Sequence, residues 1–273
     1  MGAPTSSNLY GEPGPFGLQV SRGQIAGHTS ISIFGYNPDL DQTEETVWAN
    51  GGTVPHPTSA SASTSASASA SASASVLEIS STSANDTSNG TGARTVYIEG
   101  LNDSYNTVSE TVILNGQSAV STQNSYLYVN AFYVLTVGSG GVNAGQIFAG
   151  TGVVTAGVPA VPYDVIGVGL NNRTTAHYCV PNGYTGYLVN GIFSAGQESG
   201  STGITGFLKQ HGPDGILRVG AVTAINNGAV QYDFSYPYII PEKNCIGATA
   251  IGAANNNLVS TFFNVVLIKN DVS

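Results

Sequence analysis

Hydrophobic and polar residues alternate in short runs along most of the chain. A period of two indicates a β-strand with one buried face, and no long stretch shows the 3.6-residue period of a helix. Clusters of Gly, Asn and Asp such as "SANDTSNGTGA" (83–93) separate the runs and are typical of turns. In the first half of the chain the predicted strands are "TSISIF" (29–34), "TVW" (46–48), "SVLEIS" (75–80), "RTVYIEGL" (94–101), "TVSETVIL" (107–114), "QSAVST" (117–122), "YLYVNAFYVLTVG" (126–138) and "QIFA" (146–149).

A second series of strands follows the connection "AGVPAVPYD" (156–164). It has about eight strands in roughly 110 residues, which is the number found in a jelly roll or a related sandwich. The predicted strands are "VIGVGL" (165–170), "TAHYCVP" (175–181), "GYLVNGIFSAG" (186–196), "GITGFLKQ" (203–210), "ILRVGAVTAI" (216–225), "VQYDFSYPYIIP" (230–241), "CIGATAIGA" (245–253) and "STFFNVVLIKN" (260–270).

These patterns predict an all-β protein with two β-sandwich domains, residues 25–160 and a jelly-roll-like unit over 161–273. Residues 1–24 are rich in Gly and Pro and predict an extended N-terminal arm. Turns are predicted at "GYNPDLD" (35–41) and at Asn115-Gly116, a dipeptide that favours a β-hairpin.

A Ser/Ala-rich insertion at about 58–75 has two readings. Its alternation suits a tightly packed strand, whereas its composition suits a flexible loop. We expect a surface loop over about 58–70, with the last residues joining the strand that holds Val76 and Ile79.

Composition narrows the range of partners. Charged residues are 8% of the chain and hydrophobic residues 41%, so the chain has enough apolar side chains for a core. The net charge is −9, and the seven Lys and Arg residues are scattered singly. Binding to a polyphosphate needs several cations on one face, so neither nucleic acid nor an anionic membrane is expected as a partner.

Cys179 and Cys245 have no paired spacing. A disulfide between them is one alternative, and the preferred interpretation is two small buried thiols in a reducing cytosol. The first residues lack the basic and apolar regions of a signal peptide, and no apolar stretch is long enough for a membrane span.

Candidate catalytic groups are few. His28, His56, His177 and His211 have no partner at metal-ligand spacing, so each is interpreted as a structural residue and no metal or cofactor is expected. No nucleophile elbow, zinc-protease motif or Walker loop is present. A distant pair of carboxylates could still form a glycosidase site, although nothing in the sequence favours one. The prediction is therefore that the protein is not an enzyme.

One acidic cluster, "NPDLDQTEE", has the hard oxygen ligands that calcium prefers. It contains Asp39, Asp41, Glu44 and Glu45 but lacks the glycine and distal glutamate of an EF-hand loop. A solvated turn is the preferred interpretation over a cation site.

Several segments carry a resemblance to a known family. They are "GHTSISIFGYNPDLDQTEETVWANGG", "LEISSTSANDTSNGTGARTVYIEGLNDSYNTVSETVILNGQSAV", "TQNSYLYVNAFYVLTVGSGGVNAGQIFAGTG", "VPNGYTGYL" and "FFNVVLIKN". The chain resembles, over nearly its whole length, virion structural proteins of tailed bacteriophages, especially marine and freshwater (cyanophage-like) ones. The resemblance implies incorporation into the virion, assembled in the host cytoplasm, and a structural role. Members of this group lack so long a Ser/Ala tract.

Three functions are compatible with this pattern. The first is a capsid decoration or cement protein that bridges capsomers, binds the major capsid protein and forms a homo-oligomer, expected to be a trimer. The alternatives are a neck or tail ring or fibre-attachment component, and a jelly-roll adhesin that stacks Tyr and Trp48 on sugar rings. Because Tyr is enriched in interface hot spots, the interface candidates are Tyr126, Tyr128, Tyr133, Tyr232, Tyr236 and Tyr238, some of which would instead face their own core.

Overall fold

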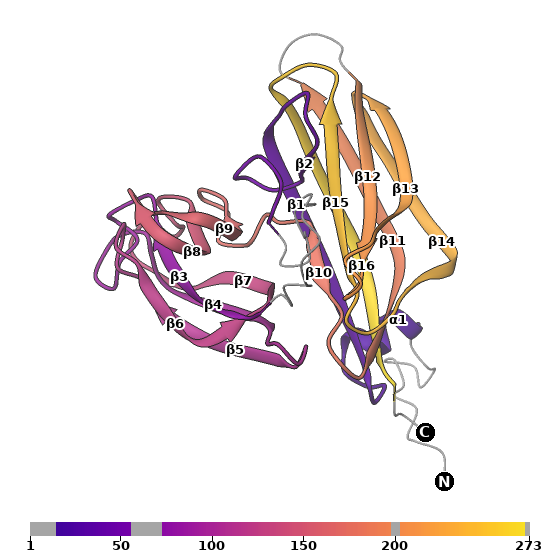
Figure 1. Cartoon of the computed structure of the whole chain (residues 1–273), viewed down its shortest axis with the longest axis horizontal. Coiled ribbons are helices and arrows are strands. Elements are labelled where there is room, and N and C mark those ends of the chain that lie inside the picture. The colour runs from indigo at the N-terminus through magenta and orange to yellow at the C-terminus, as the bar shows by residue number, and fades with distance from the viewer. Residues whose placement is uncertain (1–14, 56–72, 198–202, 271–273) are drawn as a thin grey trace, which may run out of the picture.

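The computed structural model describes residues 15–55, 73–197 and 203–270 (Figure 1). Most of these residues lie in antiparallel strands, which confirms the all-β prediction. A short helix, α1 (Phe16–Ser21), precedes the first strand. The strands are β1 (His28–Leu40), β2 (Glu45–Thr46), β3 (Ser75–Ser81), β4 (Ala93–Leu101), β5 (Thr107–Ile113), β6 (Val120–Tyr126), β7 (Tyr128–Val137), β8 (Ile147–Thr155), β9 (Val158–Ile166), β10 (His177–Cys179), β11 (Tyr184–Gln197), β12 (Gly203–His211), β13 (Leu217–Asn226), β14 (Gly228–Ile240), β15 (Cys245–Gly252) and β16 (Asn257–Lys269).

Eight of these strands form a jelly roll. Its two sheets have the orders β1-β16-β11-β14 and β10-β15-β12-β13, and β2 adds to β15. Taken in chain order, the first strand pairs with the last (β1 with β16) and the second with the second-last (β10 with β15). The pairing continues inward as β11 with β14 and β12 with β13. A long antiparallel ribbon rolled up in this way is the double Greek-key arrangement of a jelly roll.

A second sandwich is inserted into the jelly roll between β2 and β10. Its sheets have the orders β6-β3-β8-β9 and β5-β4-β7, and Figure 1 shows them beside the jelly roll. The predicted division into 25–160 and 161–273 therefore needs correction, because β1 pairs with β16 along its length and belongs to the jelly roll. A pairing across more than two hundred residues leaves no local signal in the sequence.

Each sandwich has its own apolar core. In the jelly roll Ile33 and Leu40 of β1 pack with Phe263 and Val265 of β16, which shows why the first and last strands must meet. The inserted sandwich is filled by residues such as Ile98 and Phe132. Two smaller clusters join the sandwiches: Trp48 and Val54 pack on Phe148 and Val165, and Leu101, Leu127 and Tyr128 pack on Cys179 and Cys245.

Two predicted turns differ from the structure. Residues 35–40 continue β1, with a register irregularity between Asn37 and Leu40. Pro38 is tolerated there because β1 is an edge strand, where a missing N–H breaks no ladder. The Asn115-Gly116 turn exists, with Gly116 at φ +59°, but it connects β5 to β6 in the opposite sheet and makes no hairpin.

Parts of two other predictions lie outside the described residues. These are residues 1–14 of the N-terminal arm and residues 56–72, which include most of the Ser/Ala tract. The described remainder of the arm forms α1, where Val20 is buried and the Phe16 ring meets the His28 ring edge-on at 5.9 Å. Beyond the tract, β3 contains Val76 and Ile79, as predicted.

The turn between β8 and β9 requires glycine at position 157. Ala156 and Gly157 both have positive φ, as a type I′ hairpin turn requires, and a Cβ on Gly157 would lie 1.9 Å from the Ser81 carbonyl oxygen. Gly157→Ala is expected to destabilise the protein by more than the roughly 1–2 kcal/mol of a left-handed alanine, measured by urea unfolding. Gly141→Ala is the matched control, because its φ is +75° but its Cβ meets open space. Equal losses in the two variants would contradict the steric argument.

Candidate functional site

A group of exposed apolar side chains lies on two consecutive edge strands of the jelly roll. β13 ends one sheet and β14 ends the other, so each has one backbone edge that pairs with no other strand among the described residues. Both strands carry large apolar side chains that face solvent: Ile216 just before β13, Leu217, Val219 and Val222 on β13, and Tyr236 and Ile239 on β14. Long apolar edge strands favour pairing with another chain.

A wide bulge projects part of β14 outward. Leu188 of β11 pairs with Tyr238, but Asn190 pairs with Asp233, so four residues of β14 face one residue of β11. Tyr236 lies in this bulge and is 91% exposed. The adjacent Pro237 has no backbone N–H, which suits an edge strand. The bulge therefore presents an aromatic side chain well beyond the sheet.

The six tyrosines predicted as interface residues fall into two groups. Tyr126 and Tyr128 are buried inside the chain, and the Tyr126 hydroxyl donates to Glu110 Oε1 at 3.0 Å. These two have no surface to offer a partner. Tyr133, Tyr232, Tyr236 and Tyr238 keep exposed surface, and the last three share β14. Tyr133 stacks on Tyr97 of the inserted sandwich instead, at 5.0 Å between ring centroids.

The acidic cluster after Pro38 does not converge. Glu45 is buried and accepts a hydrogen bond from Asn37 Nδ2 at 2.8 Å, whereas Glu44 pairs with Lys209 of β12. Asp39 is exposed, and its N–H donates to Asn37 Oδ1 at 2.9 Å. These three residues therefore make separate contacts, which do not bring their carboxylates to one point. A calcium site has no support here.

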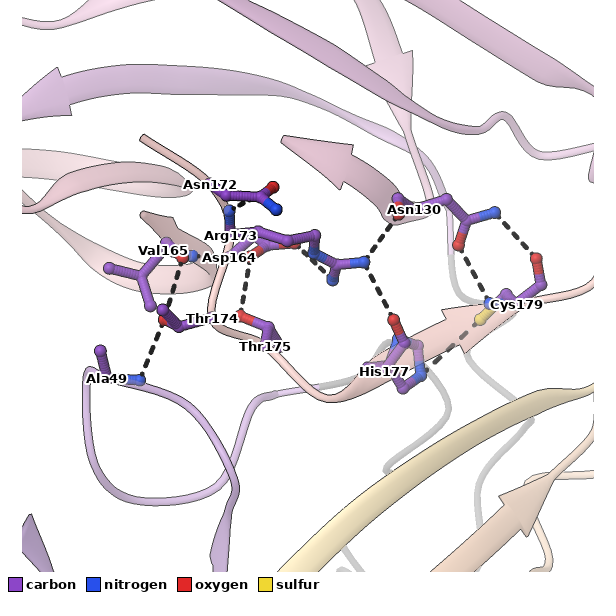
Figure 2. A network of polar contacts seen from close by, with 10 residues as sticks. All are labelled: Ala49, Asn130, Asp164, Val165, Asn172, Arg173, Thr174, Thr175, His177 and Cys179. Atoms are coloured by element: carbon purple, nitrogen blue, oxygen red, sulfur yellow. Dashed lines mark hydrogen bonds and ion pairs between the residues drawn. The ribbon is translucent and has the colours of Figure 1, made fainter. Parts of the chain in front are cut away.

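A buried ion pair holds the chain where it leaves the inserted sandwich (Figure 2). Asp164 of β9 is fully buried, and its Oδ2 lies 2.5 Å from Nη2 of Arg173. Asp164 Oδ1 also accepts from the Thr175 hydroxyl at 2.7 Å and from the Val165 N–H at 2.8 Å. Burial raises the pKa of the Asp164 carboxyl, and the guanidinium and these hydrogen bonds oppose that rise.

The same guanidinium reaches both sandwiches. Arg173 Nη1 donates to the carbonyl of Asn130 on β7 at 2.7 Å and to that of His177 on β10 at 3.0 Å. The Asn130 side chain continues the link, because its Nδ2 donates to the Cys179 carbonyl and its Oδ1 accepts the Cys179 N–H, at 2.8 and 3.0 Å. Figure 2 shows these contacts as one continuous network from β9 to β10.

Cys179 and Cys245 form a disulfide, so the preferred prediction of two free thiols is wrong. They are directly opposed on β10 and β15, a juxtaposition that their spacing in the sequence does not reveal. His177 and His211 are buried beside them. Burial lowers the pKa of His211 to about 4, so its imidazole is neutral at pH 7. Among the described residues this is the one place where ligand atoms of three His, Cys, Asp or Glu side chains, those of His177, His211 and Cys245, lie within 4.8 Å of one another.

Two further observations bear on the predicted alternatives. Trp48 is buried, and its Nε1 donates to the Gly52 carbonyl at 2.9 Å, so this ring cannot stack on a sugar. Within the residues that the structure describes, no helix is long and apolar enough to span a membrane.

Comparison with known proteins finds weak similarity to solved structures. No protein-family model and no curated protein matches the chain. Among solved structures, a similar chain is that in the crystal structure of the infectious bursal disease virus VP2 subviral particle. It is 11% identical, with a TM-score of 0.23, over 91% of this chain and 73% of that chain. At this level the similarity establishes neither a shared topology nor a shared function.

The Asp164–Arg173 pair predicts a large loss of stability when one partner is removed. Arg173→Ala leaves the Asp164 carboxylate buried without its cation, so the free energy of unfolding is expected to fall by about 3–5 kcal/mol. Urea unfolding of the purified chain measures this loss. Arg218→Ala is the matched control, since it breaks an ion pair with Asp214 that is exposed and is expected to change little.

A double variant separates charge burial from general damage to the junction. Asp164→Leu with Arg173→Leu removes both charges and is expected to recover much of the loss, because apolar replacements of buried ion pairs are often neutral. A double variant less stable than Arg173→Ala would contradict this account.

Proposed function

We propose that the chain is a non-enzymatic structural protein of a tailed-bacteriophage virion, and that it decorates the head as a cement protein. The observation that carries the proposal is the jelly-roll strand order, with β1 paired to β16 and each later strand to its mirror partner. Jelly rolls recur in viral capsid proteins and in lectins. Because a fold hosts many functions, this is an argument by analogy, and the sequence resemblance to phage virion proteins adds to it.

The exposed edge of β13 and β14 supports assembly with other chains. A monomer that left these apolar edges in water would tend to aggregate, so a partner that covers them is the simpler account. Identical subunits in closed rings are the commonest assemblies, and we take the occupant to be a second copy of this chain in a homo-oligomer, a trimer in this proposal. The remaining surface would then meet the major capsid protein.

Charge distribution agrees with a protein partner. The net charge is −9, and three of the seven cations, Arg173, Lys209 and Arg218, are engaged with carboxylates of the chain itself. Neither nucleic acid nor an anionic membrane is therefore proposed as a partner. The buried Trp48 likewise gives no support to the adhesin alternative.

Copy number in purified particles tests the proposed role. Quantitative mass spectrometry against the major capsid protein is expected to find a number of copies comparable to that of the capsid protein itself. A small number would point to the neck or tail, and absence from the particle would refute the virion proposal.

A single substitution tests the oligomer edge. Val222→Asp on β13 is expected to weaken self-association at least about tenfold, because an unpaired carboxylate buried at an interface costs several kcal/mol. Sedimentation velocity of the purified chain measures the association. Ile113→Asp on β5 is the matched control, since both side chains are 59% exposed. Equal effects of the two substitutions, or a wild-type monomer at all concentrations, would remove this edge as the interface.

A further inference from the structure

Four metal-ligand side chains lie on one face of the jelly roll, and we name them the Cys/His cluster: His177, Cys179, His211 and Cys245. Strands β10, β15 and β12 are neighbours in one sheet. Cys245 stands opposite Cys179 on one side and opposite His211 on the other. Residues opposed in antiparallel strands share a face, and His177 shares it with Cys179 two residues later. The strand register alone therefore gathers the cluster.

The cluster lies under the inserted sandwich. Tyr178 of β10 and Ile246 of β15 are the sequence neighbours of Cys179 and Cys245, and their side chains point into the jelly-roll core. Cys179 and Cys245 point the other way and pack against Leu101, Leu127 and Tyr128 of the inserted sandwich. The Tyr128 ring lies 5.8 Å from the His177 ring and 6.1 Å from the His211 ring. All four side chains of the cluster are buried.

The ligand atoms are close to the spacing of a tetrahedral zinc site. Zinc binds thiolate sulfur at about 2.3 Å and imidazole nitrogen at about 2.0 Å, so its ligand atoms lie about 3.5 Å apart. Cys179 Sγ is 3.7 Å from His177 Nε2. The ligand atoms of His177, His211 and Cys245 all lie within 4.8 Å of one another. Placing Cys179 Sγ on the same ion as these three atoms requires the cysteine side chains to rotate once the disulfide between them is broken.

The surroundings also suit a closed site. Arg173 and Asn130 hold the backbone of β10 at His177 and Cys179, which fixes the ligands from behind. A pocket of about 110 Å³ is lined in part by His177 and His211, so two of the four side chains border a cavity. Two thiolates and two imidazoles form the soft donor set that selects Zn²⁺ over Mg²⁺ or Ca²⁺.

We propose that the Cys/His cluster binds one Zn²⁺ ion as a structural site once its disulfide is reduced. The reductant is a cellular thiol such as glutathione. Two thiol molecules transfer two electrons and two protons to the disulfide, which becomes two cysteine thiols, and the two reductant molecules are left joined as one disulfide. Binding of Zn²⁺ then releases two protons as both cysteines become thiolates. The ion takes over the link between β10 and β15 and adds β12 to it. This inference does not depend on the virion role.

Cobalt substitution tests the site. The purified full chain, reduced with a phosphine under nitrogen, is titrated with Co²⁺ and then with Zn²⁺. The expected result is one ion per chain, thiolate-to-cobalt charge transfer together with tetrahedral d–d bands, and loss of these bands on adding Zn²⁺. The oxidised protein is expected to give no charge transfer, because its sulfurs are bonded to each other.

Two variants decide whether these residues are the ligands. His211→Gln keeps both cysteines, folds with its disulfide when oxidised, and is expected to lose more than the roughly 10–100-fold in metal affinity that a second-shell change costs. His28→Gln, on β1 and remote from the cluster, is the matched control and is expected to bind as the wild type does. Binding that is equal in the oxidised and reduced proteins, or unchanged in His211→Gln, would overturn the proposal.

Circular dichroism covers the case in which the reduced chain loses its fold. Recovery of the β spectrum on adding Zn²⁺ to the wild type, and not to His211→Gln, supports the site. Failure of Zn²⁺ to restore the spectrum overturns it.

Discussion

The buried Asp164–Arg173 ion pair fixes where the chain re-enters the jelly roll. The chain leaves after β2, builds a complete sandwich, and must return to β10 in the register that places Cys179 opposite Cys245. Arg173 accomplishes this by bonding Asp164 on β9, the Asn130 carbonyl on β7 and the His177 carbonyl on β10 with one side chain. Burying one of these charges without its partner costs free energy. The network therefore favours the one path of the returning chain that brings Asp164 and Arg173 together.

Local patterns in the sequence predict the strands well, because alternation depends only on which face each residue buries. They miss the partners of the strands. Nothing near "TSISIF" indicates that Ile33 will stand opposite Phe263, and Asn115-Gly116 predicts a hairpin although β5 and β6 belong to different sheets. The strand "SVLEIS" shows the opposite case, since its bounds follow directly from the return of hydrophobic alternation after the Ser/Ala tract.

The same limit applies to the candidate site. Reading each His alone gives no metal ligand, because the cluster draws its members from three strands that meet only in the folded sheet. One signal was present in the sequence: His177 and Cys179 are two residues apart in a predicted strand, so their side chains share a face. Among the candidate tyrosines, the sequence predicts exposure only in part. The Pro-containing "SYPY" marks the bulge that exposes Tyr236, whereas the apolar neighbours of Tyr126 and Tyr128 already indicated a core.

The position of the Cys/His cluster separates its role from that of the exposed edge. β13 and β14 end the two jelly-roll sheets, and no other described strand pairs with their outer edges, while the cluster faces the inserted sandwich through β10 and β15. A covalent or metal link at the cluster holds β10 against β15, and β10 is the strand to which Arg173 and Asn130 attach the inserted sandwich. His211 is the member of the cluster that adjoins the exposed edge, because it stands opposite Leu217 on β13. In the oligomer proposed above, β13 and β14 would hold the jelly rolls, and each inserted sandwich would be held by its own contacts with its jelly roll. Among the described residues these contacts are the Arg173 network, the cluster around Cys179 and Cys245, and the packing of Trp48 and Val54 on Phe148 and Val165.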